Sequence, residues 1–70
     1  MIHELDVVAL THDIREERLK EGDTGTVVYR HESGADFIVE FFAPSGLTIA
    51  VVALTREDIR LVESVAPSTD

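Results

Sequence analysis

The residues that could do chemistry begin with a glycine-rich turn in the stretch LKEGDTGTVVYR, residues 19–30. Gly22 and Gly25 could cradle a phosphate with their backbone amides if a helix followed them. The residues after Gly25 are TVVY, which is typical of a strand, and the lysine–serine/threonine pair of a phosphate-binding loop is absent. We therefore interpret both glycines as structural: they adopt backbone conformations closed to other residues and bend a strand into a small barrel.

Histidine, cysteine and serine do not combine into a metal or nucleophile site. His3, His12 and His31 lack the spacing with which paired histidines hold zinc, so we interpret them as solvated loop residues. The chain has no cysteine, which excludes a disulfide, a thiolate metal site and a thiol nucleophile. No serine lies in a nucleophile-elbow motif. We therefore expect neither a metal nor an organic cofactor.

Glu40 is the best-placed candidate for general acid–base catalysis, because it lies between hydrophobic residues in IVEFF. Strand alternation turns Glu40 to water, however, if Val39 and Phe41 face the core. A barrel of this size, filled by its own side chains, also leaves little room for a catalytic pocket. We therefore predict that the protein is not an enzyme, which disfavours a small hydrolase or a metal-dependent enzyme.

Five short apolar runs are the elements that must position these residues, and each favours a strand by length and composition. They are residues 5–10, 24–31, 36–42, 47–54 and 59–62. The charged segment 11–23 predicts a long first loop with one helical turn at 15–18, attached to the core by Ile14 and Leu19.

Turn residues separate the later strands. Gly34 marks the turn after the second strand, and Pro44 with Gly46 suits a type I turn after the third. Thr55 as N-cap, with Asp58 three residues on, predicts a 3₁₀ turn before the last strand. The predicted fold class is all-β: a small SH3-like barrel of about five strands in one domain, residues 1–65. Residues 66–70 are expected to be a flexible C-terminal tail.

Alternation predicts an exposed apolar patch. If Phe37, Val39 and Phe41 fill the core, Ile38 and Phe42 point outward. On the next strand we expect Ala50 and Val52 to join that outer patch, and such patches usually mark interfaces. Tyr29 could serve nearby as an anchor, and the acidic side chains of the first loop would suit a basic partner. The predicted partner-binding residues are Asp13, Glu16, Glu17, Tyr29, Ile38, Phe42 and Val52.

Charge restricts the class of partner. The 70 residues include 14 Asp and Glu against 6 Lys and Arg, a formal net charge of −8. Duplex nucleic acid and anionic membranes both attract basic faces, so we expect neither as a partner. The N-terminal stretch MIHELDVVAL lacks the basic region of a signal peptide. Together with the absence of cysteine, this predicts a cytoplasmic protein.

The motifs LDVVALTHDI, RLKEGDTGTVV and DFIVEFFAPSGLTIAVVALTREDIRLV resemble a small bacterial family, domain of unknown function 4926, over residues 5 to about 62. Arg15 stands where that family often has proline. The layout is more distantly similar to the SH3-like accessory protein of photosystem I and to KOW-type barrels, which are accessory or binding modules. The resemblance implies a fold and a binding role but no substrate. Some members of the family are encoded next to candidate toxins, which implies an antitoxin or immunity role.

The predicted function is that of a non-catalytic protein–protein binding module, accessory or antitoxin-like, that binds a basic partner. Two alternatives stay open. One is a structural homodimer, because so small a core contributes only about 3–5 kcal/mol to the net stability of the fold, and self-association would add to it. The other is a nucleic-acid-binding barrel of the KOW type, although acidic residues are interleaved among the basic residues of the first loop.

Overall fold

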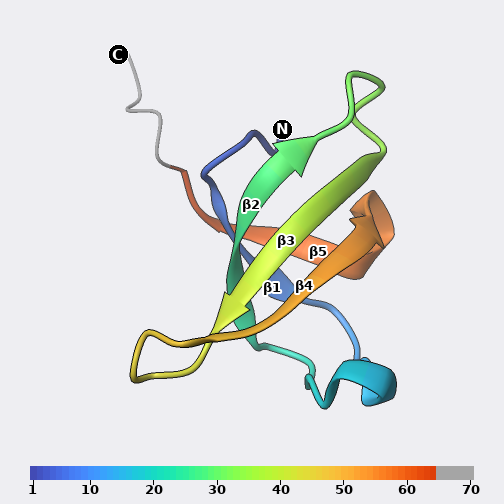
Figure 1. The fold of residues 1–70 in the computed structure, drawn as a ribbon. Helices are drawn as coiled ribbons and strands as arrows, with labels where there is room; N and C mark the ends of the chain where they lie inside the picture. Colours follow the sequence, from blue (N-terminus) through green and yellow to red (C-terminus); the bar gives the residue numbers. More distant parts are fainter. Residues whose placement is uncertain (65–70) are drawn as a thin grey trace.

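Five antiparallel strands form one curled sheet in the computed structural model, which describes residues 1–64 (Figure 1). They are β1 (Val7–Leu10), β2 (Thr24–Arg30), β3 (Asp36–Phe42), β4 (Thr48–Thr55) and β5 (Ile59–Glu63), in the order β4-β3-β2-β1-β5. Two 3₁₀ turns accompany them, η1 (Arg15–Glu17) and η2 (Arg56–Asp58). The predicted all-β class, the long first loop and the 3₁₀ turn before the last strand are confirmed. The predicted tail at 66–70 lies outside the described residues.

The N-terminal turn is closed by a buried carboxylate. Asp6 is 1% exposed and accepts the backbone N–H of His3 at 2.8 Å through Oδ2. Leu5 has a φ of 75°, which no strand residue adopts, so β1 begins at Val7 and not at residue 5 as predicted. The Leu5 N–H still reaches the carbonyl oxygen of Val27 at 2.7 Å, which fixes this turn to β2.

One apolar cluster forms the core and draws on every strand. Its buried members are Val8, Leu10, Leu19, Val27, Phe37, Val39, Phe41, Leu54 and Ile59. The expected alternation in β3 is confirmed, because Phe37, Val39 and Phe41 are all buried.

The first loop is attached to this core as predicted. Leu19 is buried and Ile14 packs against the cluster. Two backbone hydrogen bonds of 2.9 and 3.0 Å join Ile14 to Leu19 and close the loop around η1.

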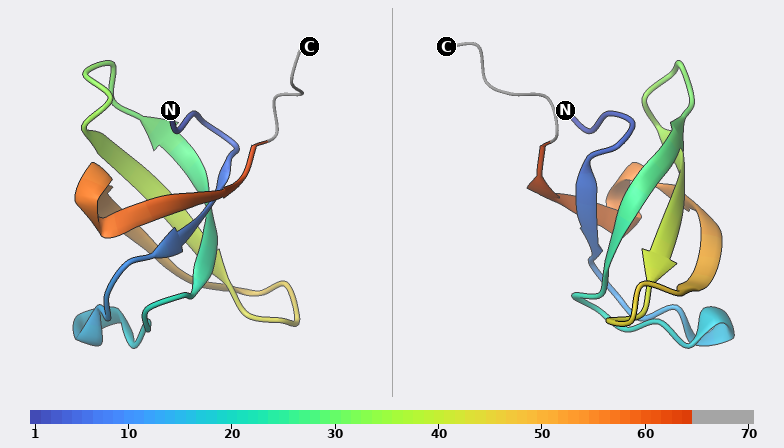
Figure 2. Two further views of the ribbon diagram at one scale, coloured as in Figure 1. Left: turned by 180° about the vertical axis from the view of Figure 1, so that it is seen from behind. Right: turned by 60° about the vertical axis from the view of Figure 1, so that its left-hand side comes forward.

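The sheet curls without closing through hydrogen bonds. β4 and β5 are its two edges, and η2 joins them in sequence with no ladder between them among residues 1–64. Figure 2 shows β4 running into η2 and the chain returning along β5. Thr55 begins η2 as the expected N-cap in a capping box, in which its side chain accepts the Asp58 N–H and its own N–H donates to Asp58 Oδ2 at 2.8 Å.

Three of the four turn glycines have a left-handed conformation, which the sequence predicted at Gly22. Gly22, Gly34 and Gly46 have φ values of 91°, 75° and 92°. The Gly46 N–H donates to the carbonyl oxygen of Ala43 at 2.8 Å, which is the bond of the predicted four-residue turn.

Gly25 has another role, and the expectation of a special backbone conformation there is wrong. It lies inside β2 without a positive φ. A Cβ at Gly25 would lie 2.7 Å from the backbone oxygen of Glu40, 2.8 Å from Cγ1 of Val39 and 2.9 Å from Cδ1 of Phe41. Glycine is therefore required by the close approach of β2 to β3.

Replacing Gly25 should therefore cost more than replacing a turn glycine. We expect Gly25→Ala to lower the free energy of unfolding by about 2–3 kcal/mol, because the methyl group overpacks the core. Gly22→Ala meets no atom within 4 Å and strains only the backbone, for about 1 kcal/mol. Urea unfolding of both variants measures the difference. An equal or smaller loss for Gly25→Ala would contradict this packing.

Candidate binding surface

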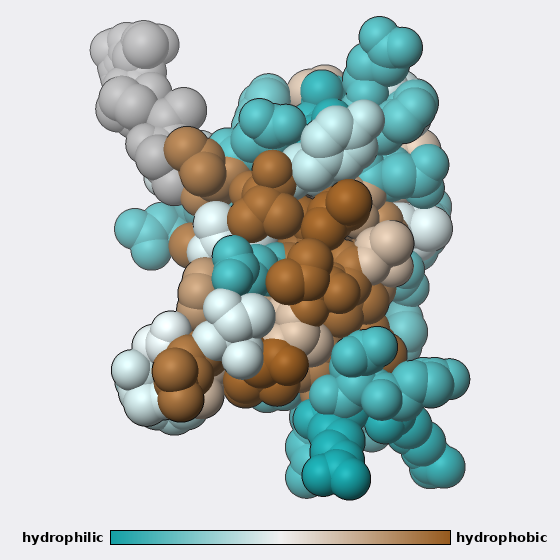
Figure 3. All heavy atoms as spheres, in the orientation of Figure 1, coloured by the Kyte–Doolittle hydropathy of each residue, from teal (hydrophilic) through white to brown (hydrophobic). Residues whose placement is uncertain are grey.

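An exposed apolar surface covers the outside of β2, β3 and β4. We call the outer apolar face the residues Tyr29, Ile38, Phe42, Ile49 and Val51. Tyr29 lies opposite Ile38 in the ladder between β2 and β3, and Phe42 is 42% exposed. Figure 3 shows hydrophobic residues gathered over β3 and β4 on this side of the molecule. Glu40 lies within this face, between Ile38 and Phe42 on β3 and opposite Val51. Exposed apolar residues gathered in this way are a frequent mark of an interface.

The facing of β4 differs from the prediction. Val52 lies opposite buried Val39, and Ala50 opposite buried Phe41, so both pack against the core. Val51 lies opposite Glu40 and points outward instead, at 57% exposed, and Ile49, at the register shift between β3 and β4, is 51% exposed. The placement of Val52 in the outer patch is therefore wrong. The apolar run in β4 has no polar alternation, so only the register with β3 determines which side is buried.

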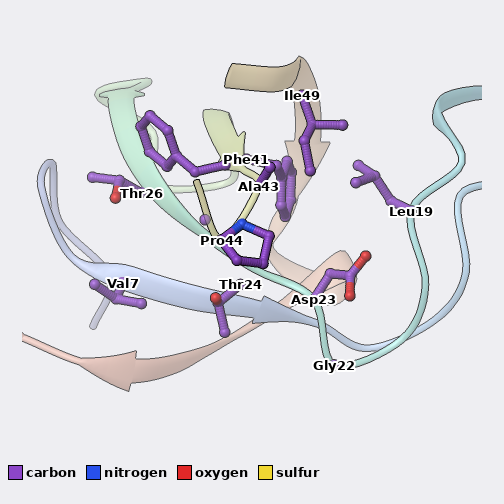
Figure 4. Close-up of a pocket in the computed structure, with 12 residues that line it drawn as sticks. Val7, Leu19, Gly22, Asp23, Thr24, Thr26, Phe41, Ala43, Pro44 and Ile49 are labelled. Carbon is purple, nitrogen blue, oxygen red and sulfur yellow. The ribbon is translucent and has the colours of Figure 1, made fainter. Parts of the chain in front are cut away.

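A groove adjoins the outer apolar face at the end of the molecule where the first loop meets the β3–β4 hairpin. Its volume is about 520 Å³. Leu19 and Asp23 line the loop side, and Phe42, Pro44 and Ile49 line the hairpin side. Figure 4 shows Leu19 and Ile49 approaching from opposite walls. Among the described lining residues Asp23 alone carries a charge, so the groove is mostly apolar and its one described charge is negative.

The predicted acidic side chains divide into two kinds. Asp13 and Asp23 shape the loop: Asp13 Oδ1 accepts the Glu21 N–H, and Asp23 Oδ2 accepts the Lys20 N–H, both at 2.9 Å. Glu16 and Glu17 lie exposed on η1, where a partner can reach them.

Tyr29 does not lie near these acidic side chains, contrary to the prediction. The first loop enters β2 at Thr24, five residues from Tyr29, which is about 17 Å along a strand. The structure therefore brings Phe42 together with the acidic loop and places Tyr29 and Ile38 toward the other end of the outer apolar face.

His12 is not simply a solvated loop residue. Its Nε2 lies 2.7 Å from Asp58 Oδ1, and its Nδ1 lies 2.9 Å from the carbonyl oxygen of Asp13. Both neighbours are acceptors, so only the protonated imidazolium donates to both. The hydrogen bond to Asp58 raises the pKa of His12 above 6.5, and the bond from His12 lowers the pKa of Asp58 below 3.8.

This pair joins the first loop to η2. Thr11 adds two hydrogen bonds to the same segment, from its N–H to the Asp58 carbonyl at 2.9 Å and from its hydroxyl to the Glu57 carbonyl at 2.8 Å. The sequence contained no signal for the contact, because His12 and Asp58 lie 46 residues apart.

Residues 1–64 contain neither a metal-binding cluster nor a membrane-spanning helix. No group of three or more histidine, aspartate or glutamate side chains in that range is arranged to hold a metal ion. No helical element in that range is long and apolar enough to cross a membrane.

Comparison with known proteins identifies the family. The family model described as a domain of unknown function, DUF4926, matches residues 4–61, and the chain belongs to that family. This confirms the resemblance expected from the sequence motifs. No curated protein and no solved structure matches the chain. The more distant similarity to the SH3-like accessory protein of photosystem I and to KOW-type barrels stays a prediction.

The His12–Asp58 pair should make stability depend on pH. The raised pKa of His12 gives a stabilisation that is complete below pH 6.5 and is lost as pH rises through the folded-state value. The lowered pKa of Asp58 gives a second stabilisation, which is present above pH 3.8 and is lost as pH falls through the pKa of Asp58 in the folded state. The pair therefore stabilises most between these two pH values.

Urea unfolding of the wild type and of His12→Gln across this range measures the effect. We expect the difference in free energy of unfolding to be constant from about pH 4 to pH 6.5 and to shrink above it. When His12→Gln is made in an Asp58→Asn background, the resulting difference in free energy of unfolding should not change with pH in this way. A difference between wild type and His12→Gln that stays unchanged up to pH 9 would refute the ion pair.

Proposed function

We propose that this member of the DUF4926 family is a non-catalytic binding module that holds a basic protein partner at the groove and the neighbouring part of the outer apolar face. The observation that carries the proposal is the position of Phe42. It is an exposed aromatic residue at an apolar groove whose described charged lining is one aspartate. Interfaces of this kind place aromatic anchors at the centre and charged residues at the rim.

Electrostatics supports a basic partner. Glu16, Glu17 and Asp23 belong to the loop that forms one side of the groove, and the whole chain has a net charge of −8. Complementary charge raises the rate of association and selects against acidic competitors. A partner would place an apolar side chain beside Phe42 and lysine or arginine residues toward the loop.

Other classes of function find less support. Asp23 is the one ionisable group among the described lining residues of the groove, whereas a paired general acid and general base would require a second ionisable group there. Arg15, Arg18 and Lys20 lie in the acidic loop, whereas Arg30 lies at the far end of β2. The other two basic residues, Arg56 in η2 and Arg60 in β5, lie on further elements, so the six are distributed over four segments of the chain. This distribution gives little support to a basic stripe for nucleic acid. We place the module in the bacterial cytoplasm as an accessory protein, with an antitoxin or immunity role as its specific form.

Affinity capture from a lysate of the native host tests the role of Phe42. We expect a basic protein to be held by the wild type and lost with Phe42→Asp, because a carboxylate cannot occupy an apolar contact without a partner. Val28→Asp is the matched control, because Val28 is 43% exposed and lies on β2 outside the groove. Equal loss with both variants, or equal retention, would contradict the assignment.

The charge of the loop can be tested separately. Glu16→Lys with Glu17→Lys changes the net charge from −8 to −4. We expect association with the captured partner to slow by roughly tenfold at low salt. Glu32→Lys with Glu63→Lys makes the same change on exposed residues outside the groove and serves as the control. Similar slowing by both pairs, measured by stopped-flow or surface binding, would show that only net charge matters.

A further inference from the structure

β4 is an edge of the sheet with neither charge nor proline, and its one irregularity is a register shift against β3 that leaves Ile49 between two paired residues. Its eight residues, Thr48–Thr55, include no charged residue and no proline. The opposite edge, β5, carries Arg60 and Glu63 within five residues. Proteins usually protect edge strands with charges, prolines or bulges, because bare edges pair with other strands.

The backbone of β4 points to where a further strand would bind. The Thr55 N–H donates to Asp58 and not to β3. Backbone groups of an antiparallel strand alternate in direction, so Ala53 and Val51 also direct their N–H and C=O groups away from β3. No ladder partner for these groups exists within residues 1–64.

We propose that the β4 edges of two copies of this chain pair antiparallel about a two-fold axis at Val51, which joins two five-stranded sheets into one. Thr55 is already engaged by Asp58, and Val51 is the midpoint of the remaining residues 48–54. The register shift at Ile49 lies toward one end of this stretch, and residues 50–54 pair regularly with β3.

A second copy is the occupant that this strand fits. With Val51 opposite itself, Ile49 lies opposite Ala53, and Ala50 lies opposite Val52, so every one of these cross-strand pairs is apolar. The pairing keeps the two faces of β4 in step, because residues that point outward meet residues that point outward. It would cover Val51 and Ile49, which are 57% and 51% exposed in one copy.

Charge distinguishes this contact from the groove. Each copy carries a net charge of −8, but the paired strands carry none. The repulsion between copies therefore comes from charges away from the contact, which salt screens over about 8 Å at physiological ionic strength. Self-association should strengthen as salt is added, whereas binding of a basic partner at the groove should weaken. The two proposals can thus fail separately.

Sedimentation velocity over a range of protein concentrations tests the pairing. We expect a dimer whose dissociation constant falls several-fold between about 0.05 M and 0.5 M NaCl. Val51→Lys places two ammonium groups opposite each other and should raise that constant about tenfold or more. Val28→Lys is the control, with the same change on an exposed residue away from the edge. A monomer at all concentrations, or equal effects of both variants, would overturn the proposal.

A cysteine scan tests the register without depending on those variants. The chain has no cysteine, so each introduced thiol reports alone. Val51→Cys should form a disulfide-linked dimer on mild oxidation, because Cα atoms in such a pair lie about 5.5 Å apart. Ala53→Cys should not, since two copies of residue 53 would lie about 14 Å apart. Absence of the Val51→Cys dimer, or equal crosslinking at both positions, would overturn the register.

Discussion

The close approach of β2 to β3 at Gly25 is the contact on which the rest of the structure depends. With no Cβ at this position, the backbone of Glu40 and the side chains of Val39 and Phe41 come within the space that a methyl group would need. The same approach brings the first loop beside the β3–β4 hairpin. Gly25 and Phe41 both line the groove, so the packing that organises the core also shapes the candidate site.

A core this small leaves apolar surface outside it. The buried cluster uses one side of β3 and β4, while Phe42, Ile49 and Val51 remain on the other. Their exposure is unfavourable in an isolated domain and favours association, because each Å² of apolar surface removed from water stabilises a complex by about 25 cal/mol. Both proposals rest on this division. The groove, which is mostly apolar and lies beside the acidic first loop, suits a basic protein. The edge of β4, which carries no charge, suits a second copy of the chain.

Local patterns predicted much of this fold, and long-range contacts account for what they missed. The alternation of β3, the turn at Pro44 and Gly46 and the capping of η2 by Thr55 and Asp58 depend on neighbours in sequence. The facing of Val52, in contrast, depends on register with β3, because the run of residues 49–54 within β4 is entirely apolar and shows no alternation. The candidate site was predicted in part: Phe42 and the acidic loop meet at the groove, but Tyr29 lies elsewhere.

The most direct measurement for the central claim, that this chain acts through the groove, is a map of backbone amide NMR shifts on adding the captured partner. Our account predicts the largest changes at Asp23, Thr24 and Phe42, which line the groove, and little change at Ser33 and Gly34 in the β2–β3 turn. Changes confined to that turn would contradict the account and would place the binding surface at the opposite end of β3.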